Sequence, residues 1–277
     1  MVIFERKVFI KRSYRKIIHL KGNKMKINLP QLCAIASLFA FNAYAETPSL
    51  QNNIIDVMKM EHRTAADKIR DANRSPVQAL SFFGFKQNMK VIEFAPGNGW
   101  YTKILAPLLE KGGELHLAYK SEWLTGLDPL LTQKGFKSAV KLPIELEWNN
   151  SEFRYDLGNL SFGMTDADMV LNIREYHNFN LADKTKLNNE AFKSLKPGGI
   201  YVIVDHTRRH MAVETRELAR REDPIKVVLE VQAAGFILEK SSDMFYRPDD
   251  ELQYEVGRKT VTGNTDRFTL VFRKPIN

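Results

Sequence analysis

The most constraining feature of the sequence is a glycine-rich turn between an apolar run and a helix-forming segment. It extends from Val91 to Leu105 and reads VIEFAPGNGWYTKIL. The apolar residues before the turn have the length of a short buried strand that ends on an acid. After the turn, apolar residues recur at helical spacing, at Ile104, Leu105, Leu108 and Leu109. The pattern predicts a strand, a tight turn and a helix, which together are typical of a site for a nucleoside cofactor.

The residue types in the turn explain its spacing. Gly97 and Gly99 let the backbone turn sharply and approach a ligand with no Cβ in between, and the first N–H groups of the helix are free to donate. The Glu93 carboxylate can accept hydrogen bonds from a ligand. A dinucleotide site needs a third glycine, but Thr102 stands at that place. The stretch instead resembles the first motif of class I S-adenosylmethionine-dependent methyltransferases, with Ala95 in the first glycine place.

This resemblance implies S-adenosylmethionine as the cofactor, with its amino acid portion held by the turn. In the family an acid at the end of the second strand holds the ribose hydroxyls. Here the only nearby carboxylate is Glu122, which comes later than in the family pattern. The residues that the resemblance places at the cofactor are Glu93, Ala95, Pro96, Gly97, Asn98, Gly99, Trp100, Tyr101, Glu122 and Asn172.

Strands and helices are predicted to alternate along the rest of the chain. The predicted strands are 91–93, 114–119, 144–148, 166–172, 200–204, 236–240 and 268–273, and the predicted helices are 53–71, 76–83, the one that ends near 111, 182–195 and 224–234. Ser75 is the predicted N-cap of the second helix. The alternation favours an α/β domain with one doubly wound sheet, mostly parallel and seven-stranded as in the class I fold. The two N-terminal helices are either a lid over the cofactor or a cap on the sheet.

Further motifs extend the resemblance to residues 46–277. They are Tyr176-His177-Asn178, Leu195-Lys196-Pro197-Gly198-Gly199 and Asp205-His206. With the glycine-rich turn, they make the chain similar to a group of bacterial predicted methyltransferases that carry signal peptides.

The net charge of +8 does not indicate nucleic-acid binding. Residues 1–45 hold nine Lys or Arg residues and one acid, which leaves 32 basic and 32 acidic residues in 46–277. A neutral body has no electrostatic footprint for DNA or RNA. The predicted partner is a small molecule.

The basic leader has the pattern of a secretory signal peptide. An apolar run from Leu32 to Phe41 is followed by Ala43-Tyr44-Ala45, which predicts cleavage after Ala45 and a periplasmic or secreted protein without stable membrane insertion. A start at Met25 would give a signal peptide of normal length without residues 1–24, and an uncleaved membrane anchor is the alternative to cleavage. Cys33, the single cysteine, lies within the apolar run, so residues 46–277 contain no thiolate.

The candidate catalytic residues follow the fourth and fifth predicted strands, where ligands bind in open α/β sheets. His177 is the first candidate for a general base, because imidazole titrates near neutrality, and His206 beside Asp205 is the second. Tyr176 and Arg174 would orient an acceptor or hold an acidic one. A hydrogen-bonded structural role is the alternative for either histidine.

Three other hypotheses remain open from the sequence. A metal site would bring together Asp205, His206, His210 and His177, although no metal is predicted. The Arg-rich stretch that contains Arg208, Arg209, Arg216, Arg220 and Arg221, with acids interleaved, is predicted to be a solvated helix face. The domain would also be compatible with a ligand-binding module that has lost the activity, or with histidine- or metal-assisted hydrolysis. The predicted function is methyl transfer to a small-molecule acceptor.

Overall fold

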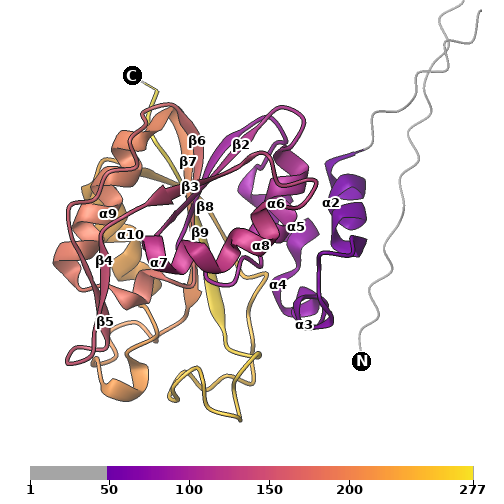
Figure 1. Cartoon of the computed structure of the whole chain (residues 1–277). Coiled ribbons are helices and arrows are strands. Elements are labelled where there is room, and N and C mark those ends of the chain that lie inside the picture. Colours follow the sequence, from indigo (N-terminus) through magenta and orange to yellow (C-terminus); the bar gives the residue numbers. More distant parts are fainter. Residues whose placement is uncertain (1–48, 277) are drawn as a thin grey trace, which may run out of the picture. The chain divides into compact units, whose positions relative to one another are not determined.

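A computed structural model of the chain describes residues 49–276 (Figure 1). The predicted signal peptide, the start at Met25 and cleavage after Ala45 lie outside the described residues. The body is built on a sheet of seven strands in the order β3-β2-β1-β6-β7-β9-β8. They are β1 (Lys90–Phe94), β2 (Glu114–Tyr119), β3 (Ala139–Pro143), β6 (Ala167–Ile173), β7 (Leu195–His206), β8 (Ile237–Ser242) and β9 (Arg267–Arg273). β9 runs antiparallel to β7 and β8, and all the other strand pairs of this sheet are parallel. This mostly parallel, seven-stranded sheet confirms the predicted fold class.

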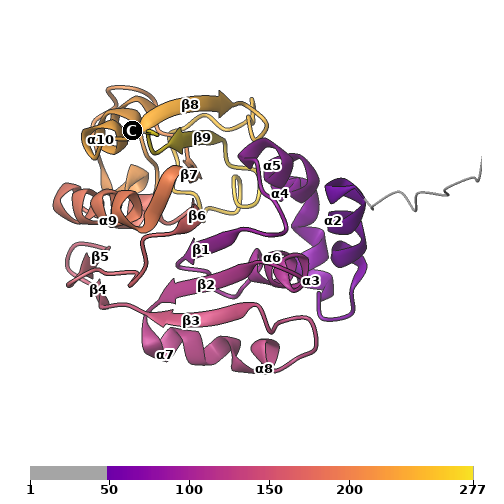
Figure 2. The ribbon, with the colours of Figure 1, turned by 90° about the horizontal axis from the view of Figure 1, so that it is seen from above.

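Helices cover both faces of this sheet (Figure 2). One face carries α2 (Leu50–Lys59), α5 (Pro76–Phe83) and α6 (Thr102–Leu109), and the other carries α9 (Leu181–Ser194) and α10 (Pro224–Ala233). Successive side chains of a strand point to opposite faces. In β1, Val91 accordingly packs into the core with α2, α5 and α6, whereas Ile92 packs into the core with α9 and α10. The sheet is therefore buried on both faces, as parallel sheets are.

Shorter elements lie at the periphery. The helices are α3 (Ala65–Ile69), α4 (Asp71–Arg74), α7 (Ser121–Leu124) and α8 (Asp128–Leu131), with 3-10 turns η2 (Thr125–Leu127), η3 (Tyr176–Asn178) and η4 (Arg216–Leu218). A separate antiparallel pair joins β4 (Leu146–Asn149) to β5 (Arg154–Leu157). Within residues 49–276, no helix combines the length and apolar character needed to cross a membrane.

Helix ends follow the residues that can cap them. The Asp223 side chain accepts a hydrogen bond from the N–H of Ile225 at 3.0 Å, which caps α10. Pro76 begins α5 and Gly84, with φ of +77°, ends it. Ser75 is the N-cap residue of α5 as predicted, but it lies in the left-handed region at φ +40° and its side chain makes no capping hydrogen bond. Ser75 is both the C-cap residue of α4 and the N-cap residue of α5.

The prediction of one N-terminal helix over residues 53–71 is wrong. The chain forms α2, α3 and α4 in succession. Thr64 begins α3 with a capping box, in which its Oγ1 accepts from the Asp67 N–H and the Asp67 carboxylate accepts from the Thr64 N–H. Arg63 is buried in the break and donates to both oxygens of Asp71, at 2.9 and 2.6 Å. A capping box starts a new helix where the apolar spacing alone does not mark one.

The predicted third strand at 144–148 corresponds to β4, Leu146–Asn149, which lies outside the main sheet, so its predicted place in that sheet is wrong. The strand that pairs with β2 is β3, at the edge of the sheet, and most of its side chains are half-buried or exposed. It therefore lacks the apolar run by which the sequence marks a buried strand. Ile144 and Leu146 are buried in the core that contains α9, and Leu146 begins the antiparallel pair.

The Arg-rich stretch 207–222 forms a mostly irregular segment, in which η4 is the single helical turn. Arg209, Arg216 and Arg220 are exposed. Arg208 and Arg221 are buried, so the predicted solvated helix face is wrong for these two. Each is held by an acid, Arg208 by Glu214 and Arg221 by Asp250.

Candidate functional site

The glycine-rich turn between β1 and α6 contains three residues in the left-handed region. The φ angle is +49° at Ala95, +56° at Gly97 and +71° at Gly99. The Ala95 N–H donates to the carbonyl of Ala118 in β2 at 2.8 Å, which ties the turn to the sheet. A Cβ added to Gly97 would meet no atom within 4 Å. The backbone at Gly97 therefore faces open space. Because glycine has no side chain, a ligand can occupy this space and approach the backbone closely.

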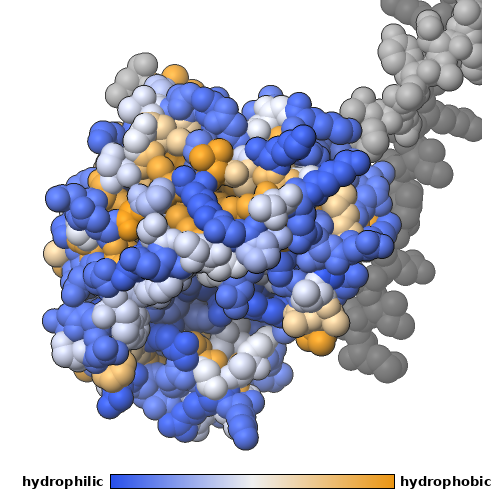
Figure 3. All heavy atoms as spheres, viewed as in Figure 1, coloured by the Kyte–Doolittle hydropathy of each residue, from blue (hydrophilic) through white to orange (hydrophobic). Residues whose placement is uncertain are grey.

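One side of this space is a cavity of about 200 Å³, called the turn cavity below. Seven predicted cofactor residues line it, namely Glu93, Ala95, Pro96, Gly97, Asn98, Trp100 and Tyr101. Charged side chains complete its wall. Asp67, Arg70 and Arg74 come from the N-terminal helices, and Arg174 and Glu175 follow β6. Figure 3 shows a hollow in the lower half of the face viewed in Figure 1, and the residues around the hollow are mainly hydrophilic.

Glu93 is buried at the base of the turn cavity, with 4% of its surface exposed. The Thr102 hydroxyl donates to Glu93 Oε2 at 2.7 Å. Burial raises the Glu93 pKa to about 7, against the opposing effects of Thr102 and Arg74. Burial likewise raises the pKa of Glu175, across the same cavity, to about 7. Two carboxyl groups in this cavity therefore titrate near neutral pH.

The shifted pKa of Glu93 predicts that the folded protein loses stability as the pH rises from about 4.5 to about 7. In this range the unfolded chain has released the proton and the folded chain still holds it, so folding becomes less favourable with increasing pH. The shift corresponds to about 3 kcal/mol. We expect urea unfolding at pH 5 and pH 8 to show a larger stability loss in the wild type than in Glu93→Gln. Parallel pH profiles for the two proteins would contradict this assignment.

The N-terminal helices contact the glycine-rich turn directly. The Trp100 indole N–H donates to the Asp67 carbonyl at 3.0 Å, and Lys103 of α6 pairs with the Asp67 carboxylate at 2.8 Å. The Arg74 guanidinium lies 4.6 Å from the centre of the Trp100 ring and 5.6 Å from that of Tyr101. Thus α2 and α5 cap the sheet, whereas α3 and α4 reach the turn cavity.

A second cavity, of about 430 Å³, shares Gly97 and Asn98 with the turn cavity and is called the aromatic cavity below. Its wall contains the rings of Tyr119, Trp123 and Tyr155. The Tyr119 and Trp123 ring centres are 4.8 Å apart, and those of Trp123 and Tyr155 are 5.6 Å apart. Glu122 also lines this cavity, with its side chain mostly exposed and 3.9 Å from Lys120 Nζ. The structure therefore brings Glu122 beside the glycine-rich turn despite its late position in the sequence.

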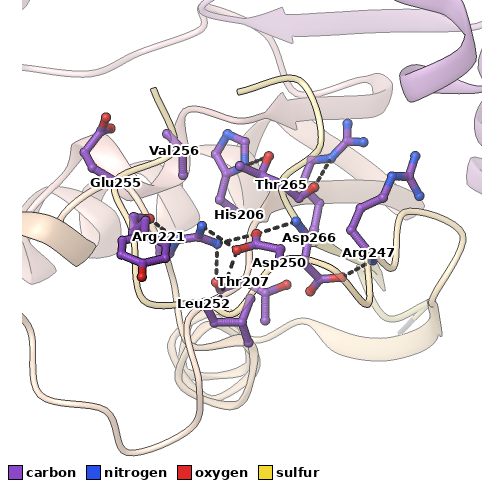
Figure 4. A network of polar contacts seen from close by, with 12 residues as sticks. His206, Thr207, Arg221, Arg247, Asp250, Leu252, Glu255, Val256, Thr265 and Asp266 are labelled. Atoms are coloured by element: carbon purple, nitrogen blue, oxygen red, sulfur yellow. Dashed lines mark hydrogen bonds and ion pairs between the residues drawn. The ribbon is translucent and has the colours of Figure 1, made fainter. Parts of the chain in front are cut away.

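Asp205, at the end of β7, holds both candidate histidines. His177 contacts Asp205 Oδ1 through Nδ1 at 2.7 Å and donates its backbone N–H to Oδ2 at 2.9 Å, and the His206 N–H donates to Oδ1 at 2.7 Å. Arg174 Nε donates to His206 Nε2 at 3.3 Å, and His206 Nδ1 lies 2.8 Å from the Thr265 hydroxyl (Figure 4). Burial holds the His206 pKa well below its usual range, with His177 and Arg174 adding to the effect. The network assigns a neutral His206 whose two nitrogens are both engaged.

Solved structures of other proteins share this fold, although the sequence comparisons find no match. No protein-family model matches the chain, and no curated protein matches its sequence. A SAM-dependent methyltransferase from Aquifex aeolicus is similar in structure, with a TM-score of 0.52 and 16% identity over 80% of this chain and 98% of its own. A second similar structure, from Methanosarcina mazei, is described as a SAM-dependent methyltransferase, with a TM-score of 0.50 and 13% identity over 72% of this chain and 98% of its own. The chain has the class I methyltransferase fold.

The methyltransferase fold does not by itself fix the reaction. A third similar structure is the [4+2]-cyclase SpnF, with a TM-score of 0.53 and 14% identity over 77% of this chain and 82% of its own. Function must therefore be argued from the side chains at the site.

Within this methyltransferase fold, several predicted site residues line neither the turn cavity nor the aromatic cavity. Tyr176 is fully buried, and its hydroxyl donates to Glu230 at 2.9 Å and accepts from Asn188 at 2.8 Å, between α9 and α10. His177 is buried beside Asp205, and Asn172 is buried within β6 opposite Phe94. Their catalytic and binding roles stay predictions. Gly99 lines neither cavity, and a Cβ added to it would be 3.1 Å from the Leu127 side chain.

The metal hypothesis is not favoured by the placement of His210. Its Nδ1 contacts Asp223 at 2.8 Å, at the start of α10, whereas His177 and His206 share Asp205. Within the described residues, no three His, Cys, Asp or Glu side chains form a group that could hold a metal ion.

The sequence did not single out the rings of the aromatic cavity or Arg70 and Arg74. An aromatic residue at the end of the second predicted strand, Tyr119, was an available signal for the first. Arg70 and Arg74 carry no such signal, because an arginine on a short helix is ordinarily solvated.

Proposed function

We propose that the protein binds S-adenosylmethionine at the glycine-rich turn and transfers its methyl group to a small-molecule acceptor. The observation that carries this proposal is the open space at Gly97, between the turn cavity and the aromatic cavity. The turn cavity is lined by charged side chains, which suit the charged amino acid portion of the cofactor. The aromatic cavity is lined by rings, which suit its nucleoside. A ligand that spans Gly97 would contact both cavities.

The described residues fit the cofactor. In the aromatic cavity, Tyr119 and Trp123 would pack on the nucleoside, and Glu122 would accept hydrogen bonds from its ribose hydroxyls. In the turn cavity, Glu93 and the backbone at Gly97 would face the amino acid portion, with its charges opposite the ionised groups of the wall. When bound, the cofactor supplies an electrophilic methyl group. The chain's own contribution is to hold the acceptor in line with it, which is a positioning effect.

Calorimetric titration of the purified protein with S-adenosylmethionine and S-adenosylhomocysteine tests the proposal. We expect saturable binding of both at one site. A folded protein that binds neither would overturn the proposed function and favour the hypothesis of a binding module that has lost the cofactor.

Trp123→Ala is expected to weaken S-adenosylhomocysteine binding about tenfold or more. Stacking of a base on an aromatic ring contributes about 1–3 kcal/mol, and Trp123 lines the aromatic cavity. Trp148→Ala is the matched control, because Trp148 also packs against Tyr155, at 5.0 Å between ring centres, and does not line that cavity. The titration measures both variants. An equal loss of affinity in the two would show that ring packing around Tyr155, and not contact with the ligand, is responsible.

We also propose that the protein is exported. The support is the basic leader, the apolar run and the small residues before Glu46 in the sequence. Intact-mass measurement of the protein from its native host tests this, since cleavage after Ala45 would leave Glu46 at the N-terminus. A mass that retains the leader would contradict cleavage.

A further inference from the structure

A third cavity, of about 430 Å³, adjoins the turn cavity and is lined by five arginines. It is called the arginine cavity below. Arg70, Arg74 and Arg174 line both cavities, whereas Arg220 and Arg267 line only the arginine cavity. His206 and hydroxyl groups of the segment 256–265 complete the wall, and in the described part of the chain none of its lining residues is acidic.

Four of these arginines have no ion-pair partner among the described residues, 49–276. They are Arg70, Arg74, Arg174 and Arg267. Burial lowers the pKa of Arg74 to about 9 and that of Arg267 to about 10, and neighbouring arginines add to both effects. Both guanidinium groups are still charged at neutral pH. Since residues 46–277 are formally neutral, this positive charge is local to the cavity.

The arginines are held in place by the surrounding backbone. Arg267 is buried and donates to the carbonyl of Asn73 at 2.6 Å, which joins β9 to the end of α4. Arg220 lies against Gly257, where an added Cβ would be only 2.7 Å from its Nη2. Arg174 is fixed by its bond to His206. Guanidinium groups that are positioned before a ligand arrives lose less entropy when they bind an anion.

The arginine cavity lies where the acceptor of a methyl group would be held. Its shared wall with the turn cavity places it next to the proposed cofactor site, and Arg174 and His206 place it at the ends of β6 and β7. In open α/β sheets, ligands bind off these carboxyl ends. We infer that the arginine cavity binds the acceptor through a carboxylate or phosphate group, a conclusion that rests on the proposed function.

The arginine cavity has no free general base among its described lining residues, and an anionic acceptor group would not need one. His206 is the one histidine that lines the cavity among the described residues, and both of its nitrogens are engaged by Arg174 and Thr265. A carboxylate is already deprotonated at neutral pH, so its binding requires no proton acceptor. Arginine forms paired hydrogen bonds to carboxylate and phosphate oxygens.

The test is calorimetric titration of the full-length protein with citrate and with pyrophosphate, each in the presence and absence of S-adenosylhomocysteine. We expect at least one anion to bind to the complex with S-adenosylhomocysteine, more weakly at high salt because the attraction is screened. Stronger binding of citrate would assign a carboxylate, and stronger binding of pyrophosphate a phosphate.

Arg267→Gln should weaken the anion about tenfold or more and leave S-adenosylhomocysteine affinity unchanged, because Arg267 lines the arginine cavity but neither of the other two, and has no ion-pair partner within residues 49–276. Arg209→Gln is the control, since Arg209 is exposed and its substitution removes the same charge outside the cavity. Arg220→Gln should have a smaller effect than Arg267→Gln, because Arg220 is already paired with Glu255.

Four results would overturn the inference. They are binding of S-adenosylhomocysteine with no binding of either anion, equal effects of Arg267→Gln and Arg209→Gln, and competition between the anion and S-adenosylhomocysteine, which would mean that the arginines hold the cofactor's own carboxylate. The fourth is anion binding by a protein that does not bind S-adenosylhomocysteine. That result would remove the proposed function and the role as an acceptor site, but would leave an anion site.

Discussion

Gly97→Val is expected to abolish measurable binding of S-adenosylhomocysteine while the protein stays folded. A valine side chain would enter the open space at the junction of the turn cavity and the aromatic cavity. Forcing extra carbons into an occupied space costs about 1–3 kcal/mol even when the surroundings adjust, and the upper value corresponds to roughly a hundredfold in affinity. The loss would appear in the calorimetric titration.

The control for this prediction is Gly163→Val. Gly163 has φ of +66°, close to the +56° of Gly97, and an added Cβ would also meet nothing within 4 Å. Both variants therefore carry a similar backbone cost, about 1–2 kcal/mol for a non-glycine residue in the left-handed region. Gly163 lies in the loop before β6 and lines none of the three cavities. If Gly97→Val binds S-adenosylhomocysteine as the wild type does, the site is not at this turn.

Local sequence signals predicted much of the fold. The bounds of β2 at 114–119 and of α5 at 76–83 agree with the structure, because both have a regular apolar pattern and end at glycine or at turn residues. The glycine-rich turn was identified for the same reason, since a left-handed backbone and an open approach require glycine. Features that depend on a few adjacent residues are readable without knowledge of the tertiary contacts.

Features that depend on distant contacts were not readable. The edge strand β3 is defined by its pairing with β2 and not by an apolar run. The arginine cavity combines Arg70 and Arg74 from the N-terminal helices with Arg267 from the last strand. An isolated arginine in a sequence predicts a solvated side chain, and only the fold shows that several of them line one cavity without acids to pair with.

The Arg221–Asp250 pair is the other place where a single substitution should have a large effect. Both side chains are fully buried, and two hydrogen bonds of 2.9 Å join them. Arg221 also donates to the carbonyls of Tyr254 and Thr207, and Asp250 accepts from the Asp266 N–H at 2.7 Å (Figure 4). The pair therefore connects the segment after β7 with the segment before β9, which carries Thr265 of the arginine cavity.

Arg221→Met is expected to lower the free energy of unfolding by about 3–5 kcal/mol, because it leaves the Asp250 carboxylate buried without its partner. The measurement is urea unfolding, with Arg220→Met as the control. Arg220 is the next residue, and its pair with Glu255 is partly exposed, so its loss should cost less than about 1 kcal/mol. Adding Asp250→Leu to Arg221→Met should recover part of the stability, since it removes the unpaired charge. A double variant less stable than Arg221→Met would indicate that the hydrogen bonds of Asp250 to the backbone, rather than its charge, hold the segment before β9 in place.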